Sequence, residues 1–169
     1  MGEPRLERIV IAGLDNAGKT VILNRMATGQ VVETTPSTSF EIMQFNYNNT
    51  QVILFSVAGG EEHRDFLLLP FSQARGLIFV VDATDGRRLD QAYAQFRTCV
   101  EALAHGAPIV VFANKQDLEN VVPTNEIAES LHLDELQSHP THVQETCALS
   151  GQGLFDGLNW LLGILSGPQ

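Results

Sequence analysis

The chain has 169 residues, of which 44% are hydrophobic and 18% charged, so it is long enough for one well-cored domain and too short for two. We therefore expect a single domain over residues 1–169. The formal net charge of −10 argues against a nucleic-acid partner and an anionic membrane surface, because both are bound through clustered lysines and arginines.

The cysteines and the ends of the chain indicate where the protein resides. Cys99 and Cys147 have no metal-ligand spacing, and we expect them to be small buried residues in a reducing compartment. No apolar segment is long enough to span a bilayer, and no signal sequence opens the chain. Leu6 stands where a myristoylation motif needs serine or threonine. We expect a cytoplasmic protein, and peripheral membrane association stays an open alternative.

Short apolar runs rich in β-branched residues alternate with amphipathic stretches along the chain. This alternation predicts an α/β fold in which a mostly parallel sheet carries helices on both faces. The expected strands are, in chain order, residues 8–12, 39–46, 51–57, 76–82, 108–113 and 142–147. The second and third are separated by Tyr47-Asn48-Asn49, which predicts an antiparallel hairpin.

Two further stretches have the spacing of packed helices. Between the fourth and fifth strands, apolar residues recur every three to four positions until Gly106 stops the pattern. These positions are Leu89, Ala92, Phe96, Val100 and Leu103. The last segment, residues 154–165, is richer in apolar residues and should be a largely buried closing helix.

A glycine-rich turn joins the first strand to a helical segment, residues 21–26. Its residues are Gly13, Leu14, Asp15, Asn16, Ala17, Gly18, Lys19 and Thr20, which fit G-x-x-x-x-G-K-T. In such a loop backbone N–H groups converge on phosphate oxygens at a helix N-terminus. Lys19 would neutralise the β- and γ-phosphates, and the Thr20 hydroxyl would bind Mg²⁺. The alternative is a plain turn that only starts a helix.

A second polar segment, Asn114-Lys115-Gln116-Asp117, follows the apolar fifth strand. The Asp117 carboxylate would accept two hydrogen bonds from guanine, whereas adenine presents an acceptor at its N1 position. After the sixth strand, backbone N–H groups of Cys147 and Ala148 would meet the guanine carbonyl. This third segment is weak evidence by itself, and an ordinary loop is its alternative.

These strings together resemble the ADP-ribosylation factor (Arf) and Arf-like family of Ras-type small GTPases. The matches are G-L-D-N-A-G-K-T at residues 13–20, G-L-I-F-V-V-D at 76–82, F-A-N-K-Q-D-L at 112–118 and T-C-A-L-S-G-Q-G-L at 146–154. The resemblance implies a P-loop NTPase of the Ras-like type, with a six-stranded sheet and five helices. It also implies a GTP/GDP switch with Mg²⁺ that binds effectors through two switch loops and the hairpin between them.

The first switch motif of the family, Pro-Thr-x-Gly-Phe, is altered in this chain. Its counterpart is Pro36-Ser37-Thr38-Ser39-Phe40. Ser37 keeps a hydroxyl at the position of the Mg²⁺-binding threonine but lacks the methyl group that stiffens threonine. Thr38 is a possible substitute, although a shift of one residue would point it to the other side of an extended chain.

The second switch motif, D-x-x-G-Q in the family, is more strongly altered. Gly59 is retained, and its N–H would bond the γ-phosphate. Ser56 replaces the carboxylate that holds Mg²⁺-bound water, and Gly60 replaces the glutamine that orients the attacking water. Glu61 is an alternative catalytic residue, disfavoured by its repulsion from the γ-phosphate. The alternative is that these glycines form only a strand-to-helix turn with no role at the phosphates.

The expected partners are effectors, with an exchange factor and an activating protein. Of the family's three aromatic residues around the hairpin, Phe40 and Phe55 match and Pro70 stands at the third place. The expected effector surface consists of Ser37, Thr38 and Phe40 in the first switch, Phe55 in the hairpin, and Phe66, Leu67 and Pro70 in the second switch.

Two functions follow from the resemblance. The first is a Mg²⁺-dependent GTP/GDP switch with very slow intrinsic hydrolysis, aided by a partner's arginine. The second is a hydrolysis-deficient, GTP-bound interaction module, and the Ser56 and Gly60 pair leans toward it. A P-loop kinase or ATPase is disfavoured by the guanine-reading segment at residues 114–117.

Overall fold

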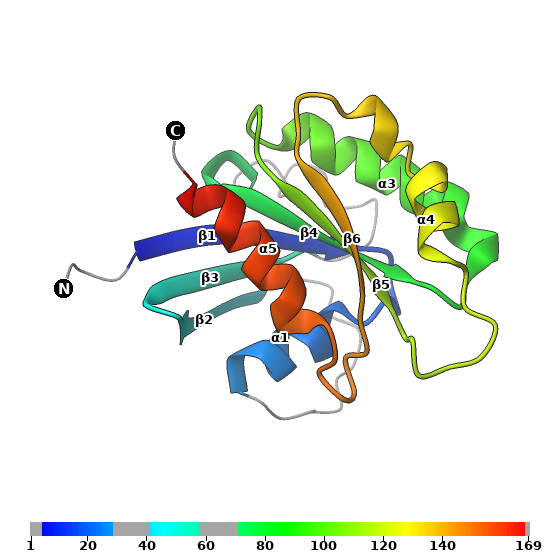
Figure 1. Cartoon of the computed structure of the whole chain (residues 1–169), viewed down its shortest axis with the longest axis horizontal. Coiled ribbons are helices and arrows are strands. Elements are labelled where there is room, and N and C mark those ends of the chain that lie inside the picture. Colours follow the sequence, from blue (N-terminus) through cyan, green and yellow to red (C-terminus); the bar gives the residue numbers. More distant parts are fainter. Residues whose placement is uncertain (1–4, 29–40, 58–70, 168–169) are drawn as a thin grey trace.

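The sheet organises the molecule (Figure 1). The computed structural model describes residues 5–28, 41–57 and 71–167, and in these residues one six-stranded sheet has the order β2-β3-β1-β4-β5-β6. Its strands are β1 (Arg5–Gly13), β2 (Glu41–Tyr47), β3 (Thr50–Ser56), β4 (Gly76–Asp82), β5 (Ile109–Asn114) and β6 (Thr141–Glu145). Only β2 is antiparallel to its neighbour, β3. The predicted mostly parallel sheet is confirmed.

The hairpin between β2 and β3 turns at Asn48 and Asn49. Both have left-handed backbones, with φ of 46° and 59°, as a two-residue hairpin turn of type I′ requires. Tyr47 pairs with Thr50 directly across this turn. The predicted hairpin is therefore confirmed; residues 39 and 40 of its first strand lie outside the described residues.

Among the described residues, the α-helices include the three predicted ones and one that the sequence did not predict. They are α1 (Lys19–Thr28), α3 (Leu89–Ala102), α4 (Thr124–Ser130) and α5 (Leu154–Ser166), with 3₁₀ turns η2 (Gly86–Arg88) and η3 (Leu133–Glu135). The helices predicted over residues 21–26, 89–103 and 154–165 correspond to α1, α3 and α5. Within the described residues, no helix has the length and apolar character needed to cross a bilayer.

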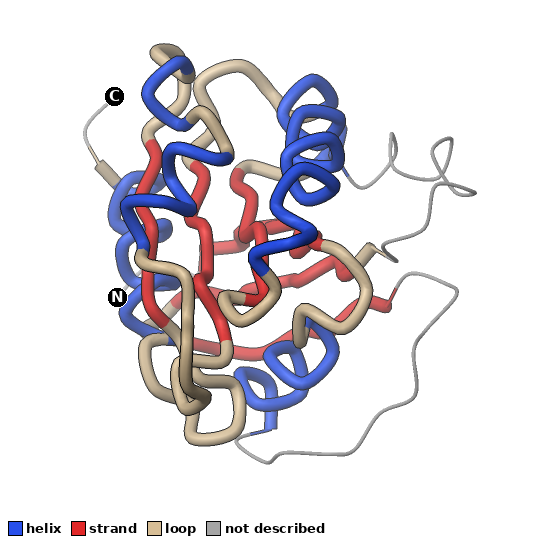
Figure 2. The backbone as a smooth tube through the Cα atoms, turned by 90° about the vertical axis from the view of Figure 1, so that its right-hand side faces the viewer, coloured by secondary structure: helices blue, strands red, loops and turns tan. Residues whose placement is uncertain are grey.

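Strand residues alternate between two apolar layers, one on each face of the sheet. In β1, Ile9 and Ile11 pack with α1 and α5, whereas Val10 and Ala12 pack with α3 and α4. Figure 2 shows helices flanking the strands on both sides. Because successive side chains of a strand point to opposite faces, an apolar run such as residues 9–12 fills both layers.

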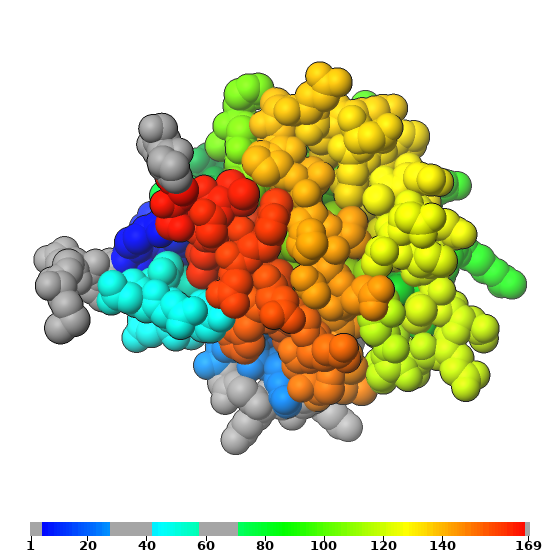
Figure 3. Space-filling view, viewed as in Figure 1, coloured from blue at the N-terminus to red at the C-terminus, as the bar shows by residue number. Residues whose placement is uncertain are grey.

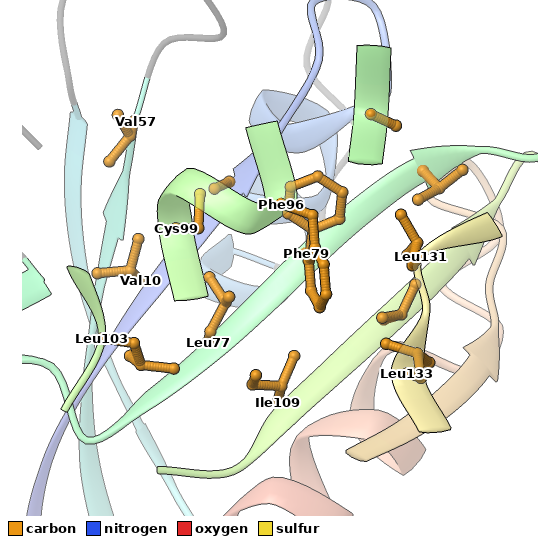
Figure 4. Close-up of a cluster of buried hydrophobic side chains, with 14 of the residues drawn as sticks. Val10, Val57, Leu77, Phe79, Phe96, Cys99, Leu103, Ile109, Leu131 and Leu133 are labelled. Atoms are coloured by element: carbon orange, nitrogen blue, oxygen red, sulfur yellow. The ribbon is translucent and has the colours of Figure 1, made fainter. Parts of the chain in front are cut away.

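The layer beneath α3 contains an aromatic pair and a buried thiol (Figure 4). Phe79 of β4 meets Phe96 of α3 edge to face, with ring centroids 5.0 Å apart. Cys99 is buried beside them, and burial raises the pKa of its thiol to about 12. Cys147 is also buried, and both cysteines are free thiols, as the sequence predicted.

The opposite layer is closed by α5, which lies beside the β2–β3 hairpin on the surface in Figure 3. Tyr47 stacks on Phe155 with ring centroids 4.9 Å apart, and its hydroxyl donates to Asn159 Oδ1 at 2.9 Å. At Gly157 a side chain would collide with the ring of Phe112, so glycine lets the helix lie directly on β5. These contacts confirm the closing helix.

An ion cluster lies at the amino edge of the sheet, where β1 begins. Glu7 is 1% exposed, and its carboxylate accepts from Arg5 at 2.6 Å and from Arg75 at 3.1 Å. Arg5 also donates to the carbonyl of Leu165 in α5 at 3.2 Å. The prediction that the first strand begins at Arg8 is therefore corrected: three more residues join it because these arginines neutralise Glu7.

Candidate nucleotide-binding site

Three predicted segments meet at the carboxyl edge of the sheet. Residues 13–20 follow β1, residues 114–117 follow β5, and residues 146–150 follow β6. Parallel strands end at the same edge, and Figure 2 views the molecule toward these loops. Ligands of open α/β sheets bind at this edge. The structure therefore brings the predicted phosphate and base segments together.

The phosphate loop has a backbone that glycine makes possible. Gly13 and Gly18 have φ of +149° and +107°. A Cβ atom would collide with the Val80 carbonyl at the first glycine and with the Asn114 side-chain amide at the second. Neighbouring strands thus approach the loop so closely that they leave no room for side chains at these two positions.

Lys19 is the buried cation of the loop. Its Nζ donates to the carbonyls of Gly13 at 2.6 Å and Leu14 at 2.9 Å. Burial lowers the pKa of its ammonium group to about 8, because desolvation disfavours the charged form. A phosphate anion would compensate this desolvation. Thr20 follows it in the first turn of α1, where the helix N-terminus also favours an anion.

Asn114, the first residue of the 114–117 segment, links the phosphate loop to residues 146–150 through its buried side-chain amide. Its Nδ2 donates to the carbonyl of Ala17 at 2.9 Å. Its Oδ1 accepts from the Thr146 hydroxyl at 3.1 Å and from the Ala148 N–H at 3.2 Å. Each hydrogen-bonding group of the amide thus holds a different loop. Residues 146–150 form part of this arrangement rather than a separate loop.

The residues predicted to contact guanine, Cys147, Ala148 and Asp117, differ in their protein contacts. The Ala148 N–H is directed to Asn114, and the Cys147 N–H donates to the carbonyl of Gln152 at 3.0 Å. A guanine carbonyl at this place would compete for the same two donors. Asp117, the predicted base reader, has an exposed side chain at the open end of the site.

Lys115, in the segment of residues 114–117, contacts the end of β4. Its backbone is left-handed, with φ of 70°, and its Nζ donates to Asp82 Oδ2 at 2.8 Å. Asp82 also accepts from the Thr84 N–H at 2.9 Å. Burial opposes ionisation of Asp82, but the bonds from Lys115 and Thr84 outweigh it and lower the pKa of the carboxyl. Asp82 therefore holds the Lys115 side chain in place.

One charged contact at the phosphate loop was not predicted. Asp15 accepts from Arg88 Nη2 at 2.6 Å, and the bond from this guanidinium lowers the pKa of the Asp15 carboxyl. Arg88 ends the 3₁₀ turn η2, six residues after the last residue of β4. Its place just beyond a strand's carboxyl end is the one signal in the sequence that could have identified it.

Ser56 is the final residue of β3 and is 6% exposed. It pairs with Ile11 of β1, two residues before the phosphate loop. Its neighbour Phe55, predicted to bind effectors, is half-buried and lies opposite Ile42, which is 56% exposed. Ile42 thus adds an apolar side chain that the sequence analysis did not single out.

The remaining predicted switch residues lie outside the described residues. They are Ser37, Thr38, Phe40, Gly59, Gly60, Glu61, Phe66, Leu67 and Pro70. In the described part of the chain, no group of three or more histidine, cysteine, aspartate or glutamate side chains is arranged to hold a metal. Of the two predicted Mg²⁺ ligands, the Thr20 hydroxyl is the one described.

Comparisons with known proteins agree with this geometry. The sequence model of the ADP-ribosylation factor family matches residues 1–165. ADP-ribosylation factor 3 of Arabidopsis thaliana is 37% identical over 159 residues, which cover 94% of this chain and 87% of that protein. The Arl6 BBS3 small GTPase of Trypanosoma brucei, with the nucleotide analogue GppNp bound, has a TM-score of 0.84 and 26% identity, covering 95% of this chain and 98% of that one.

Proposed function

Because the chain belongs to the ADP-ribosylation factor family of Ras-type small GTPases, which are nucleotide-binding switches, we propose that it binds GTP and GDP with Mg²⁺ and hydrolyses GTP very slowly. The observation that carries the proposal is the buried Asn114 carboxamide, which joins the phosphate loop to the base segment. One ligand that carries both phosphates and a purine would span these two segments.

The phosphates would be held by residues 13–20 and by the N–H of Gly59. The buried Lys19 ammonium would exchange its two carbonyl acceptors for β- and γ-phosphate oxygens. Thr20 and Ser37 would supply hydroxyl ligands to Mg²⁺, which neutralises charge that develops on the phosphates. Ser56, at the position of the family's carboxylate, would hold the Mg²⁺-bound water more weakly, because a neutral hydroxyl attracts it less than a carboxylate does.

The base would be read at residues 114–117. The exposed Asp117 carboxylate is free to accept from the guanine N1–H and exocyclic amine. Lys115, anchored on Asp82, would cover the base with its aliphatic stem. Cys147 and Ala148 would contribute their N–H groups at the guanine carbonyl, in exchange for their present acceptors.

A second function is favoured by the substitutions in the second switch. No residue is assigned a catalytic role, because Gly60 has no side chain to orient water and Glu61 would be repelled by the γ-phosphate. Ser56 also weakens the hold on Mg²⁺. A GTP-bound module that signals without turnover is therefore the second candidate.

Proteins of this family act through effectors, exchange factors and activating proteins. For this chain we propose the effector surface predicted from the sequence, namely Ser37, Thr38, Phe40, Phe55, Phe66, Leu67 and Pro70. Ile42 extends it, because this exposed side chain lies opposite Phe55 on the hairpin. A cytoplasmic location, with or without peripheral membrane association, completes the proposal.

Hydrolysis is tested by loading the full chain with GTP and Mg²⁺ and identifying the bound nucleotide by chromatography over a day. GDP that accumulates slowly supports the switch, and persistent GTP supports the module. The double variant Ser56→Asp with Gly60→Gln should hydrolyse faster. If it does not, the explanation of the second switch is wrong.

Guanine recognition is tested in parallel with Asp117→Asn. An asparagine can accept at only one side-chain oxygen and presents a donor that meets the guanine donors, so GTP affinity should fall at least about 100-fold. A matched control is Asp134→Asn, which removes an exposed carboxylate from η3. Unchanged GTP affinity in Asp117→Asn would remove the assignment of the base reader.

A further inference from the structure

The phosphate loop is bridged to the 3₁₀ turn η2 by a single arginine. Arg88 Nη2 donates to the Asp15 carboxylate at 2.6 Å, and Nη1 donates to the Asp15 backbone carbonyl at 3.3 Å. The guanidinium therefore holds both the side chain and the backbone of one loop residue. Asp15 itself is 59% exposed, while Arg88 is 29% exposed.

Arg88 extends from a connection that the rest of the site holds in place. The Ala83 N–H donates to the Asn114 carbonyl at 3.1 Å, and the Ala83 carbonyl accepts from the Val122 N–H at 2.7 Å. One residue earlier, Asp82 binds Lys115. The connection from β4 to α3 thus contacts the base segment at one end and, through Arg88, the phosphate loop at the other.

The position of Asp15 poses an electrostatic problem for a loop that binds phosphates. An unbalanced carboxylate there would repel the nucleotide, and the repulsion would grow with the number of phosphates. Protonation does not remove this charge, because the bond from Arg88 lowers the pKa of Asp15. The guanidinium, bonded to the carboxylate at 2.6 Å, is the cation that contributes most to balancing it, and the Lys19 ammonium adds a smaller attraction.

We propose that Arg88 is a positioning residue for nucleotide binding, which neutralises Asp15 and turns its carboxylate toward η2, so that the phosphates of GTP meet no unbalanced negative charge. The inference rests on the proposed function, since it presumes that phosphates occupy this loop. It differs from direct recognition because Arg88 acts through Asp15.

A purely structural ion pair would behave differently. Exposed ion pairs contribute little to folding, so Arg88→Gln should leave the melting temperature within about 2 °C of the unmodified chain. If Arg88 only stiffened the fold, affinities for all ligands of the site would change alike. Charge balance instead predicts a loss that depends on the phosphates of the ligand.

The experiment measures the binding of GTP, GDP and guanosine to the full chain by competition with a fluorescent GDP. The variants are Arg88→Gln, Asp15→Asn and the double substitution. The control is Arg97→Gln, which removes an equal charge from an exposed pair on α3, where Arg97 lies 3.8 Å from Glu101. We expect Arg88→Gln to weaken GTP about ten-fold, GDP less and guanosine by under about two-fold.

Rescue separates the proposal from its alternatives. In the Asp15→Asn background, Arg88→Gln should change GTP affinity by less than about two-fold, because the carboxylate that Arg88 bonds at 2.6 Å is gone and its remaining pair, with Asp85, is longer at 3.9 Å. Equal losses for GTP and guanosine, no loss for GTP, or the same loss in both backgrounds would overturn the proposal. Failure of the unmodified chain to bind GTP would overturn the proposed function and this inference with it.

Discussion

At the amino edge of the sheet, the buried Glu7 carboxylate is paired with two arginines, whereas at the carboxyl edge the buried Lys19 ammonium donates to two neutral carbonyls. Glu7 lies near the start of β1, and Lys19 follows the end of the same strand. The first has full opposite charge beside it. The Lys19 ammonium has only the partial negative charges of two carbonyl oxygens beside it, and a phosphate anion would attract it more strongly.

This difference separates a charge that holds the fold from one that awaits a ligand. Removing a member of the amino-edge cluster should cost folding free energy and leave ligand binding intact. Removing Lys19 should do the reverse, because its burial already penalises the charged form.

The largest effect is expected for Lys19→Ala. Loss of a charge-assisted contact to two phosphates should reduce GTP affinity at least about 100-fold, while the unbound protein stays folded. Titration with fluorescent GTP measures the affinity, and a thermal melt shows whether the unbound protein is folded. Arg75→Ala is the matched control at the amino edge and should keep its GTP affinity; if both variants lose binding equally, the two edges do not differ as described.

Asn114→Ala should affect both properties, since this amide ties loops of the carboxyl edge together. Removing it leaves the Ala17 carbonyl and the Thr146 hydroxyl without this partner, which costs about 1–3 kcal/mol of unfolding free energy. GTP affinity should fall about ten-fold or more as the loops separate. Urea unfolding and titration measure the two, with Asn159→Ala, an exposed amide on α5, as the comparison. Loss of stability without loss of affinity would disprove the coupling.

Glu7→Gln tests the amino edge alone. Two half-exposed arginines would lose their common carboxylate, and we expect the unfolding free energy to fall by about 1–2 kcal/mol with GTP affinity unchanged. Urea unfolding gives the first quantity and titration the second. Weakened GTP binding would mean that the amino edge also shapes the nucleotide site.

Asp82→Asn should have the smallest effect. The folded-state pKa of Asp82 is lowered, so its stabilising contribution is present above the ordinary carboxyl pKa and is lost as pH falls through the folded value. The variant should therefore lose less stability than the unmodified chain below about pH 4, with a difference under about 1 kcal/mol at neutral pH. Thermal melts from pH 3 to 7 measure this difference. The same loss of stability at low pH in the variant and the unmodified chain would contradict the prediction.

The sequence predicted all strands of the described sheet, because their β-branched runs are bounded by polar or glycine-rich turns. It placed the start of β1 too late, since Glu7 reads as a solvated charge until Arg75, distant in sequence, is seen beside it. It did not predict α4, a seven-residue helix that buries Ile127 alone. Short helices with one buried residue leave no periodic signal.

In the site, the motifs located the phosphate and base segments because such strings carry their own backbone geometry. They did not reveal Arg88, since an arginine in a polar turn has no pattern that names its partner. They also did not reveal that one amide, Asn114, joins two loops. Contacts between segments far apart in sequence arise from the sheet topology, which brings strand ends together.

The hydrogen bond between Arg5 and the Leu165 carbonyl joins the first residue of β1 to the last turn of α5. Figure 1 shows both at the side of the molecule away from the phosphate loop. Fluorescent reporters fused next to these residues would therefore sit close enough for efficient energy transfer while leaving the ligand edge clear. A short linker between them would likewise permit circular permutation, with new ends opened at the Asn48-Asn49 turn.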